Sequence, residues 1–420
     1  MLILDVKGNF YNQVLEYSKL FDREDDIIEI SLNSKTRYNP LDKPHLKSTV
    51  LANRLKTILE LFSPNNSESY WLDKAQDIIS ESIKLCRLYN NGYVTFTEIH
   101  NLVNYRDYYK TKIENLRLLF QSGNMSYEDI YNLYSALNFF ENEFINLDER
   151  TKSILKSEIT RITGTFISDF EISNIFCPKK EDVNFSGFYD AIKNGKIVVL
   201  NMNIAEYKNL SKIIAAYLKL DFQSEVLFQL SKNSNDISPT VFMCDEYQEY
   251  VTISDADFFS QSREAKCINI ISTQSYSSIL NTLQNEASVK VIIQNLINKL
   301  WLRTDDLFTI ESAQKQIGRE DKVKISKNIS ENAAETNFNY FTNSLNSKKS
   351  NISESISTQI QTDYIFDTNF FTKNLKTFNC LAFISDGRKI QPTHLVQLIP
   401  YFDNPTLTTK TNKKSSLKII

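Results

Sequence analysis

The chain has 420 residues, of which 41% are hydrophobic and 24% are charged, and its formal net charge is −3. These values are typical of a folded protein of two or three domains, and the charge argues against a basic field over the whole surface. The five cysteines show no C-x-x-C spacing, which argues against a disulfide framework or a zinc site. No run of about 18 apolar residues is present, so we expect no membrane span and a cytoplasmic location.

Residues 1–68 contain two strand patterns with a helix between them. Residues 1–4 and 27–32 are apolar enough for buried strands, and Val14, Leu15 and Leu20 share one side of the intervening helix. A domain that opens on the first residue of a core strand is unusual. We therefore expect that another segment normally precedes residue 1.

Residues 69–180 have the pattern of a helical domain. From Ser69 to Ile175, apolar side chains recur with the three-to-four spacing of buried helices, and no strong strand pattern interrupts them. We interpret this segment as an all-α insertion into the surrounding α/β sequence.

Strands alternate with helices after the insertion. An apolar strand follows the turn at Asn194-Gly195, and a helix with one apolar face from Leu210 to Phe222 comes next. This alternation predicts a mostly parallel α/β sheet with right-handed crossovers. Further strands are expected at residues 240–244, 267–272, 298–303 and 381–385.

The C-terminal part is more polar. Residues 326–360 are rich in Ser, Asn and Lys and have little hydrophobic support, so we expect a flexible excursion there. A final strand region covers residues 361–405. Residues 406–420 form a basic tail, for which a solvated end is favoured over contact with DNA.

The strongest chemical pattern is an apolar strand, Thr240–Cys244, that ends in Asp245-Glu246. This is the Walker B arrangement, in which the strand places both carboxylates at the edge of the sheet where ligands collect. There Asp245 would hold a water of the Mg²⁺ shell, and Glu246 would polarise the attacking water. The pattern alone is weak, because any buried strand can end in an acidic turn.

A second apolar strand, Cys267–Ser272, ends in Thr273-Gln274. One crossover helix fits between the two strands, so we expect them to be parallel neighbours whose ends share one edge. Thr273 would then contact the nucleotide. Gln274 would hydrogen-bond a γ-phosphate or the attacking water and report the nucleotide state.

These segments together resemble the TraG/TraD group of type IV coupling proteins, which belongs to the HerA/FtsK class of P-loop ATPases. Two of the matching segments, Asn298–Thr304 and Ala313–Arg319, are similar to the part of this group that recognises a relaxosome protein, TraM. The matching segments, in chain order, are Leu2–Gly8 with its D-x-K-G element, Tyr38–Leu41, Tyr70-Trp71, Thr240–Glu246, Ser262–Lys266, Ile271–Ser275, Asn298–Thr304 and Ala313–Arg319.

The resemblance implies a RecA-like nucleotide-binding domain, formed by residues 1–68 and 181–325 around the all-α insertion at 69–180. It implies ATP and Mg²⁺ as cofactors and a homo-hexamer that moves DNA. The implied partners are single-stranded DNA, a relaxase, a relaxosome accessory protein and a type IV secretion channel. Full-length members of the group are anchored in the bacterial inner membrane.

The phosphate-binding loop of this class, G-x-x-x-x-G-K-[ST], does not occur in the 420 residues, whose only Gly-Lys pair is Gly195-Lys196. Without it, the sequence offers no cradle of backbone N–H groups for the β-phosphate and no lysine for the γ-phosphate. We interpret the chain as a coupling protein that starts late, is split or is truncated. We expect it to bind nucleotide poorly by itself.

Three basic residues are further candidates. Lys7 follows the first strand and would approach phosphate, although an ordinary turn lysine is the favoured interpretation. Arg263 and Arg319 are candidates for an arginine finger that reaches the nucleotide of a neighbouring subunit, although a surface role is favoured for each. The three histidines lie in unrelated contexts and predict neither a metal site nor acid–base catalysis.

Two other functions stay open. Loss of the P-loop favours a non-catalytic adaptor that retains cargo recognition and subunit contacts. The sequence is also compatible with a HerA/FtsK-class DNA translocase of a phage or mobile element. The presence of both Asp245 and Glu246 favours an ancestor, or an assembled complex, that hydrolysed ATP.

Overall fold

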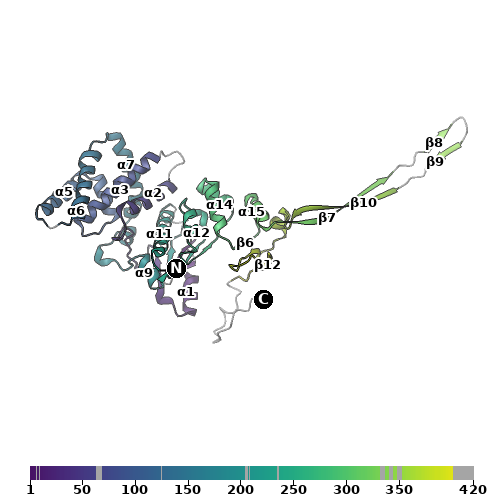
Figure 1. Ribbon diagram of the computed structural model, residues 1–420, viewed down its shortest axis with the longest axis horizontal. Helices are drawn as coiled ribbons and strands as arrows, with labels where there is room; N and C mark the ends of the chain where they lie inside the picture. Colours follow the sequence, from purple (N-terminus) through teal and green to yellow (C-terminus); the bar gives the residue numbers. More distant parts are fainter. Residues whose placement is uncertain are drawn as a thin grey trace. The chain divides into compact units, whose positions relative to one another are not determined.

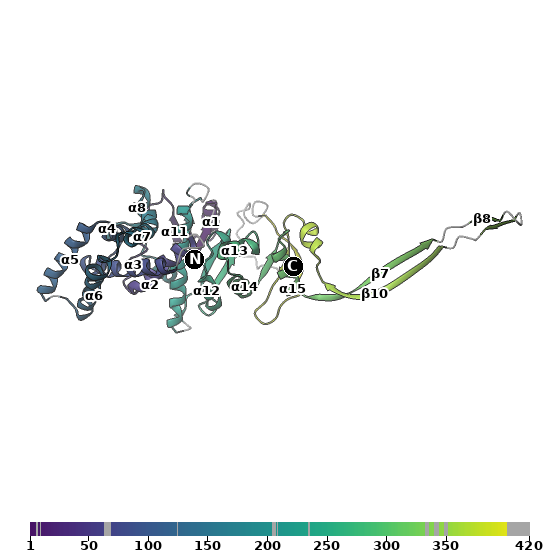
Figure 2. The same cartoon turned by 90° about the horizontal axis from the view of Figure 1, so that it is seen from above.

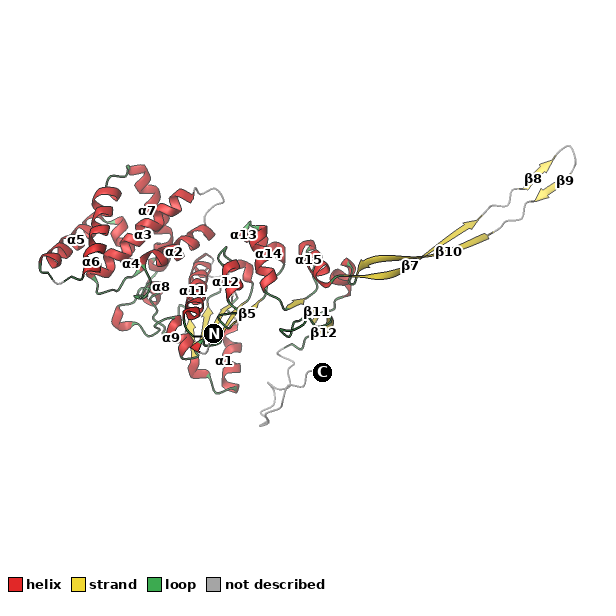
Figure 3. Cartoon of the chain, in the orientation of Figure 1, coloured by secondary structure: helices red, strands yellow, loops and turns green. Residues whose placement is uncertain are grey.

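The chain divides into two compact units in the computed structural model. The first unit comprises residues 1–274 and 278–296, and the second comprises residues 275–277 and 297–420. The first contains a parallel sheet and a helical part, and the second contains a small antiparallel sheet and a long β-ribbon (Figures 1 and 3). The structure describes residues 1–5, 7–8, 10–62, 69–123, 125–203, 207, 209–233, 236–331, 336–339, 344–347 and 352–400.

A five-stranded parallel sheet with the strand order β2-β3-β1-β4-β5 forms the centre of the first unit. β1 is the middle strand, where Leu4 is fully buried between Leu200 of β3 and Cys244 of β4. The predicted parallel α/β sheet is confirmed, and β4 and β5 are parallel neighbours as predicted. The strand bounds are Leu2–Asp5 (β1), Ile27–Ile30 (β2), Ile197–Asn201 (β3), Thr240–Cys244 (β4) and Cys267–Ile271 (β5).

Helices connect these strands and pack against the sheet. The helix α11 (Asn209–Phe228) is buried along most of its length, and its Phe222 ring stacks on Phe242 of β4 with 6.2 Å between ring centroids. α13 (Tyr276–Leu283) has residues in both units. The other helices of this part are α1 (Phe10–Leu20), α9 (Phe188–Lys193), α12 (Asp255–Gln261) and α14 (Glu286–Asn295), with 3-10 turns at Glu24–Asp26 (η1), Lys180–Asp182 (η3), Gln229–Ser231 (η4) and Tyr247–Glu249 (η6).

The helical part of the first unit confirms the predicted helices between residues 69 and 175. Thr95, Ser126 and Asp148 each begin a helix by accepting a hydrogen bond from the backbone N–H three residues later. α2 precedes residue 69 and also packs against α3. The elements are α2 (Ser48–Phe62), α3 (Ser69–Tyr89), α4 (Phe96–Asn104), α5 (Arg106–Gln121), α6 (Tyr127–Asn138), the π-helical turn η2 (Phe139–Phe144), α7 (Glu149–Ile167) and α8 (Phe170–Phe176). None of the described helices has both the length and the apolar character that crossing a membrane requires.

A buried carboxylate joins the helical part to the sheet. Asp221 on α11 is fully buried and forms ion pairs with Arg54 of α2 at 2.7 Å and with Lys43 at 3.2 Å. The buried hydroxyl of Tyr38 donates a hydrogen bond to the same carboxylate. Although burial favours the neutral acid, the two cations hold the pKa of Asp221 below its ordinary value. The carboxylate is therefore charged in the folded protein.

The second unit has its own antiparallel sheet, in the order β12-β11-β6. We predicted the strands near residues 298–303 and 381–385 as members of the parallel sheet, and this prediction is wrong, because β6 and β11 pair with each other. They do so because both contribute side chains to a separate apolar cluster with α15 and η7: Trp301, Ile310, Ala313, Phe371, Leu375, Leu381 and Phe383. The bounds are Lys299–Trp301 (β6), Leu307–Ile317 (α15), Phe370–Asn374 (η7), Asn379–Phe383 (β11) and His394–Gln397 (β12).

A two-stranded antiparallel ribbon extends from Gly318 in the same unit (Figures 1 and 2). β7 (Arg319–Glu331) pairs with β10 (Ile352–Tyr364), and β8 (Thr336–Asn339) pairs with β9 (Ser344–Ser347). The described residues between 326 and 360 form strands, which we did not predict, and the flexibility of this excursion stays a prediction. Alternating β-branched residues favour strand pairing here despite the high mean polarity. The predicted basic tail at 406–420 lies outside the described residues.

Removing the buried carboxylate should strongly destabilise the first unit. Asp221→Ala leaves Lys43 and Arg54 buried without a counter-charge, which costs about 3–5 kcal/mol of the free energy of unfolding. Asp73→Ala is the matched control, because it breaks an exposed ion pair with Lys56 that is worth about 1 kcal/mol or less. Urea unfolding followed by circular dichroism measures both values, and equal losses would contradict the role of Asp221.

The same carboxylate should make the stability of the first unit depend on pH. Because the pKa of Asp221 is lowered on folding, its contribution is complete above the ordinary value of 3.8 and is lost as the pH falls through the lowered folded value. Asp221→Asn lacks this titration. The urea midpoint should therefore fall less steeply in this variant than in the unchanged chain between about pH 5 and about pH 2.

Candidate functional site

The carboxyl ends of β1, β4 and β5 lie at one edge of the parallel sheet, because these neighbouring strands run in the same direction. Lys7 follows β1, Asp245 and Glu246 follow β4, and Thr273 and Gln274 follow β5. The structure thus brings five of the residues predicted from the sequence to a single edge. Ligands of open parallel sheets bind at edges of this kind.

Glu246 contacts several of these residues. Its Oε1 lies 3.4 Å from Lys7 Nζ, its Oε2 accepts a hydrogen bond from Gln248 Nε2 at 2.6 Å, and Gln274 is a further polar neighbour that stabilises its charged form. Although partial burial favours the neutral acid, these partners hold the pKa of Glu246 below its ordinary value. Its backbone is left-handed, with φ 48° and ψ 49°, a conformation that is uncommon outside glycine and that recurs at functional turns.

Asp245 is held at the same turn by two neighbouring strands. Its backbone N–H donates to the carbonyl of Leu4 in β1 at 3.1 Å, and the hydroxyl of Ser272 after β5 donates to its carboxylate. Asp245 is half-buried, so part of the carboxylate stays accessible at the edge. Ser272 was not predicted as a site residue, since a hydroxyl at the end of a strand was its only signal.

Gln248 links the turn after β4 to the end of β5. Its side-chain amide donates to Glu246, and its Oε1 accepts a hydrogen bond from Thr273 Oγ1 at 2.8 Å. Its backbone carbonyl accepts a hydrogen bond from Thr282 of α13 at 3.0 Å. The sequence did not predict this residue, because an amide two positions after an Asp-Glu pair belongs to no motif that we recognised.

The turn after β1 explains the D-x-K-G element. The buried carboxylate of Asp5 accepts hydrogen bonds from the backbone N–H of Lys7 at 2.9 Å and of Phe10 at 2.7 Å. Gly8 has φ +69°, which favours glycine. These residues form a tight turn that carries Lys7 to the sheet edge.

A buried ion pair supports the segment that follows the acidic turn. Lys219 of α11 is fully buried, and its Nζ lies 2.6 Å from the carboxylate of Asp255. The amine also donates to the carbonyl of Tyr250 and the hydroxyl of Thr252, while the hydroxyl of Tyr247 donates to the Asp255 carboxylate at 2.7 Å. Burial lowers the pKa of Lys219, although Asp255 opposes this effect. The sequence signal for this pair was a lysine between two leucines, Leu218 and Leu220, in the apolar part of this helix.

The structure does not bring Arg263 and Arg319 into this group. Arg263 lies in the turn before β5, at the opposite end of that strand from Gln274. Arg319 lies in the second unit at the start of β7, where its guanidinium stacks over the ring of Tyr364 at 4.4 Å and donates to its hydroxyl at 3.1 Å. An arginine-finger role stays a prediction for both residues.

β5 is the outermost strand of the sheet beside Thr273 and Gln274. Its Ile268 and Ile270 are 57% and 50% exposed, although strands of parallel sheets normally have both faces covered. Within the described part of the first unit, no strand pairs with the outer side of β5, and the face that carries these two isoleucines is uncovered.

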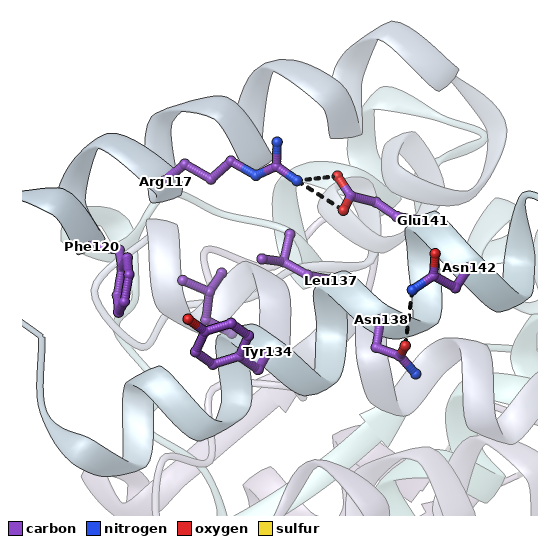
Figure 4. Close-up of a pocket in the computed structure, with 8 residues that line it drawn as sticks. Arg117, Phe120, Tyr134, Leu137, Asn138, Glu141 and Asn142 are labelled. Carbon is purple, nitrogen blue, oxygen red and sulfur yellow. Dashed lines mark hydrogen bonds and ion pairs between the residues drawn. The ribbon is translucent and has the colours of Figure 1, made fainter.

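A cavity of about 400 Å³ lies in the helical part, and none of the predicted site residues lines it (Figure 4). Arg117 points toward Glu141 and forms two hydrogen bonds with its carboxylate, at 2.7 and 2.8 Å. The lining residues are Arg117, Phe120, Leu133, Tyr134, Leu137, Asn138, Glu141 and Asn142. Over the described ranges, no group of three or more His, Cys, Asp or Glu side chains is arranged to hold a metal ion.

The fold is similar to that of solved coupling proteins. The bacterial conjugative coupling protein TrwBdeltaN70, in an unbound form, matches 95% of this chain and 84% of its own length, with a TM-score of 0.57 and 10% identity. The plasmid coupling protein TrwB in complex with the non-hydrolysable GTP analogue GDPNP matches 95% and 85%, with a TM-score of 0.57 and 11% identity. TrwB in complex with ADP and Mg²⁺ matches 95% and 86%, with the same TM-score and identity. At such identities the likeness establishes the fold, and no curated protein matches the sequence.

Residues 239–363 match the family model described as the TraM recognition site of TraD and TraG. This match confirms the resemblance to TraG/TraD-group type IV coupling proteins. The matched segment begins just before β4 and includes Asp245, Glu246, Thr273 and Gln274. It therefore contains most of the candidate site as well as the residues for which the sequence resemblance predicted TraM recognition.

Replacing the lysine of the site should change the titration of its glutamate. Lys7→Met removes the positive charge 3.4 Å from Glu246, so the pKa of Glu246 should rise toward its ordinary value of 4.5. The carboxyl chemical shift of Glu246, followed by NMR against pH, measures the change. Lys19→Met, which removes an exposed lysine of α1, is the control, and a Glu246 titration unchanged in Lys7→Met would refute the ion pair.

Proposed function

We propose that this chain is the cytoplasmic part of a type IV coupling protein that works as an ATP-driven hexameric translocase. In this role it delivers single-stranded DNA and an attached relaxase to a conjugative type IV secretion channel, from an anchor in the inner membrane. The observation that carries the proposal is the group of Lys7, Asp245, Glu246 and Gln274 at the ligand-binding edge of a coupling-protein fold.

The residues of this edge fit the work of phosphoryl transfer to water. Bound Mg²⁺ and ATP would supply the transferable phosphoryl group and the charge that neutralises it. The half-buried carboxylate of Asp245 would hold a water of the magnesium shell, and Glu246 would orient and polarise the attacking water. With its pKa below the ordinary value, Glu246 is charged at neutral pH, and its carboxylate can accept a hydrogen bond from the attacking water and orient it.

The amide residues would report the state of the nucleotide. Gln274 is among the polar neighbours that lower the pKa of Glu246, so a change in its contact with a γ-phosphate would alter the surroundings of that carboxylate. Gln248 contacts both Glu246 and Thr273, and it would carry such a change between the two strand ends.

The phosphate cradle is the part that these residues do not supply. The 420 residues contain no G-x-x-x-x-G-K-[ST] sequence. We propose that the cradle lies beside β5, because no strand pairs with the outer side of β5 in the described part of the first unit. A parallel strand added there would have its carboxyl end next to Thr273 and Gln274, and its following loop would lie near the carboxylates.

DNA would contact several assembled copies of the chain. The net charge of −3 gives one chain no overall basic field, so a ring of copies would have to concentrate local cations around the phosphate backbone. Contacts of this kind track the backbone without reading its sequence. The match of residues 239–363 to a TraM recognition site supports a relaxosome accessory protein as a further partner.

A non-catalytic adaptor is the alternative that the absent P-loop favours. Such a protein would keep the fold and the partner-recognition segment but would not hydrolyse ATP. The DNA upstream of the codon for Met1 separates the two functions. An upstream frame that encodes membrane helices and G-x-x-x-x-G-K-[ST] would support the translocase, and its absence would leave the adaptor.

The 420-residue chain by itself should bind Mg·ATP weakly and should show no hydrolysis that depends on Glu246. The reason is that its carboxylates have no phosphate cradle beside them. Calorimetric titration with a non-hydrolysable ATP analogue and a phosphate-release assay measure the two properties.

The control for this experiment is Glu264→Gln, which neutralises an exposed glutamate before β5. Tight binding and hydrolysis that is abolished by Glu246→Gln but retained in Glu264→Gln would show that the chain is a complete motor. That result would refute the proposal of an incomplete nucleotide site.

A further inference from the structure

The ribbon of β7 and β10 has two chemically different faces. Opposite residues of an antiparallel pair point to the same face, and successive residues alternate between faces. The apolar face carries Val323, Ile325, Ile329, Ile356 and Ile360. The polar face carries Lys322, Lys324, Ser326, Asn328, Ser355, Ser357, Gln359 and Gln361.

Side-chain contacts agree with this division. Lys327 and Glu354 have the register of the apolar face, and they form an ion pair with each other. Lys324 and Asp363 have the register of the polar face, and their charged atoms are 3.5 Å apart. The strand register therefore assigns one of these ion pairs to each face of the ribbon, just as it assigns the aliphatic side chains to one face.

No described element of the chain covers the apolar face. The valine and the four isoleucines named above are between 60% and 70% exposed. None of them belongs to the apolar cluster around Trp301 and Phe371 in the same unit. An isolated two-stranded ribbon is at best marginally stable in water, and a row of exposed aliphatic side chains on one face marks an interaction surface.

We propose that the apolar face packs against the apolar face of the ribbon from a second copy of this chain. Two ribbons packed in this way form a small four-stranded sandwich, with about 10 Å between the two sheets. Valine and isoleucine from both copies then fill the space between the sheets, and the polar faces stay in water.

The charges of the apolar face favour a copy of the same chain as the occupant. Lys327 and Glu354 have opposite signs, so together they give this part of the face no net charge. A nucleic acid would require a surplus of cations, which the apolar face does not offer. An isologous contact uses the same patch on both partners, and a neutral, apolar patch meets its own copy without unpaired charge.

The size of the face limits the strength of the contact. The 13 residues of each strand extend over about 44 Å, and two strands are about 10 Å wide, so the face covers about 400 Å². A standard stable interface buries about 800 Å² on each partner. The ribbon contact by itself is therefore weak, and its two-fold symmetry means that it joins copies in pairs and is separate from the repeating contact of the proposed ring. It goes beyond the proposed translocase function and does not depend on nucleotide.

Two single-cysteine variants of the full chain test the contact. Thr358→Cys places a thiol on the apolar face opposite Ile325, and Ser357→Cys places one on the polar face at the adjacent position. Both positions are exposed, and four of the five native cysteines are buried. After treatment with a short bismaleimide, the yield of covalent dimer should be several-fold higher for Thr358→Cys than for Ser357→Cys.

A second substitution tests whether apolar packing causes the cross-link. In the Thr358→Cys background, Ile360→Lys should reduce the dimer yield to that of Ser357→Cys, whereas Gln359→Lys on the polar face should not. Circular dichroism of each variant verifies that the chain is folded.

Three results would overturn the proposal. Equal yields from the two cysteine variants would mean random collision, and a yield unaffected by Ile360→Lys would mean a contact elsewhere. Protection of Thr358→Cys from maleimide only when phosphatidylglycerol vesicles are added would identify a lipid surface as the occupant. None of these results would bear on nucleotide hydrolysis, so the proposed translocase function would still stand.

Discussion

Asp221 is the residue on which the arrangement of the first unit depends. A charged carboxylate is stable at this fully buried position only because Lys43, Arg54 and Tyr38 surround it. These partners come from α2 and from the segment between β2 and α2, whereas Asp221 itself lies on the helix that packs on the sheet. One buried carboxylate thus fixes the helical part to the α/β part, because moving either would leave a charge without its partner.

The same helix also supports the candidate site. Lys219 lies two residues before Asp221 on α11, and it binds Asp255 in the segment that follows Glu246. The two buried ion pairs connect α11 to different neighbours. A single rigid helix therefore sets the position of the helical insertion and that of the turn with the two site carboxylates.

Much of the fold and part of the site could be predicted from the sequence. The strands of the parallel sheet and the helical insertion were predictable, because their apolar residues recur with the periods of strand and helix. Asp245, Glu246 and Gln274 could be placed at one edge, because parallel neighbouring strands end together. Gln248 and Ser272 could not, since their roles depend on partners across the turn that no spacing in the sequence reveals.

The sequence by itself determined the local elements, the acidic turn after β4 and the tight D-x-K-G turn, because each depends on residues within a few positions of one another. Only the tertiary structure decided that β6 pairs with β11 and that the polar C-terminal segment forms a ribbon with one apolar face. It also decided that Asp221 meets Arg54 and Tyr38, which lie 167 and 183 residues away. Such pairings depend on which distant surfaces bury each other's apolar groups and charges. Local sequence patterns cannot predict these partners, because they report only on residues a few positions apart.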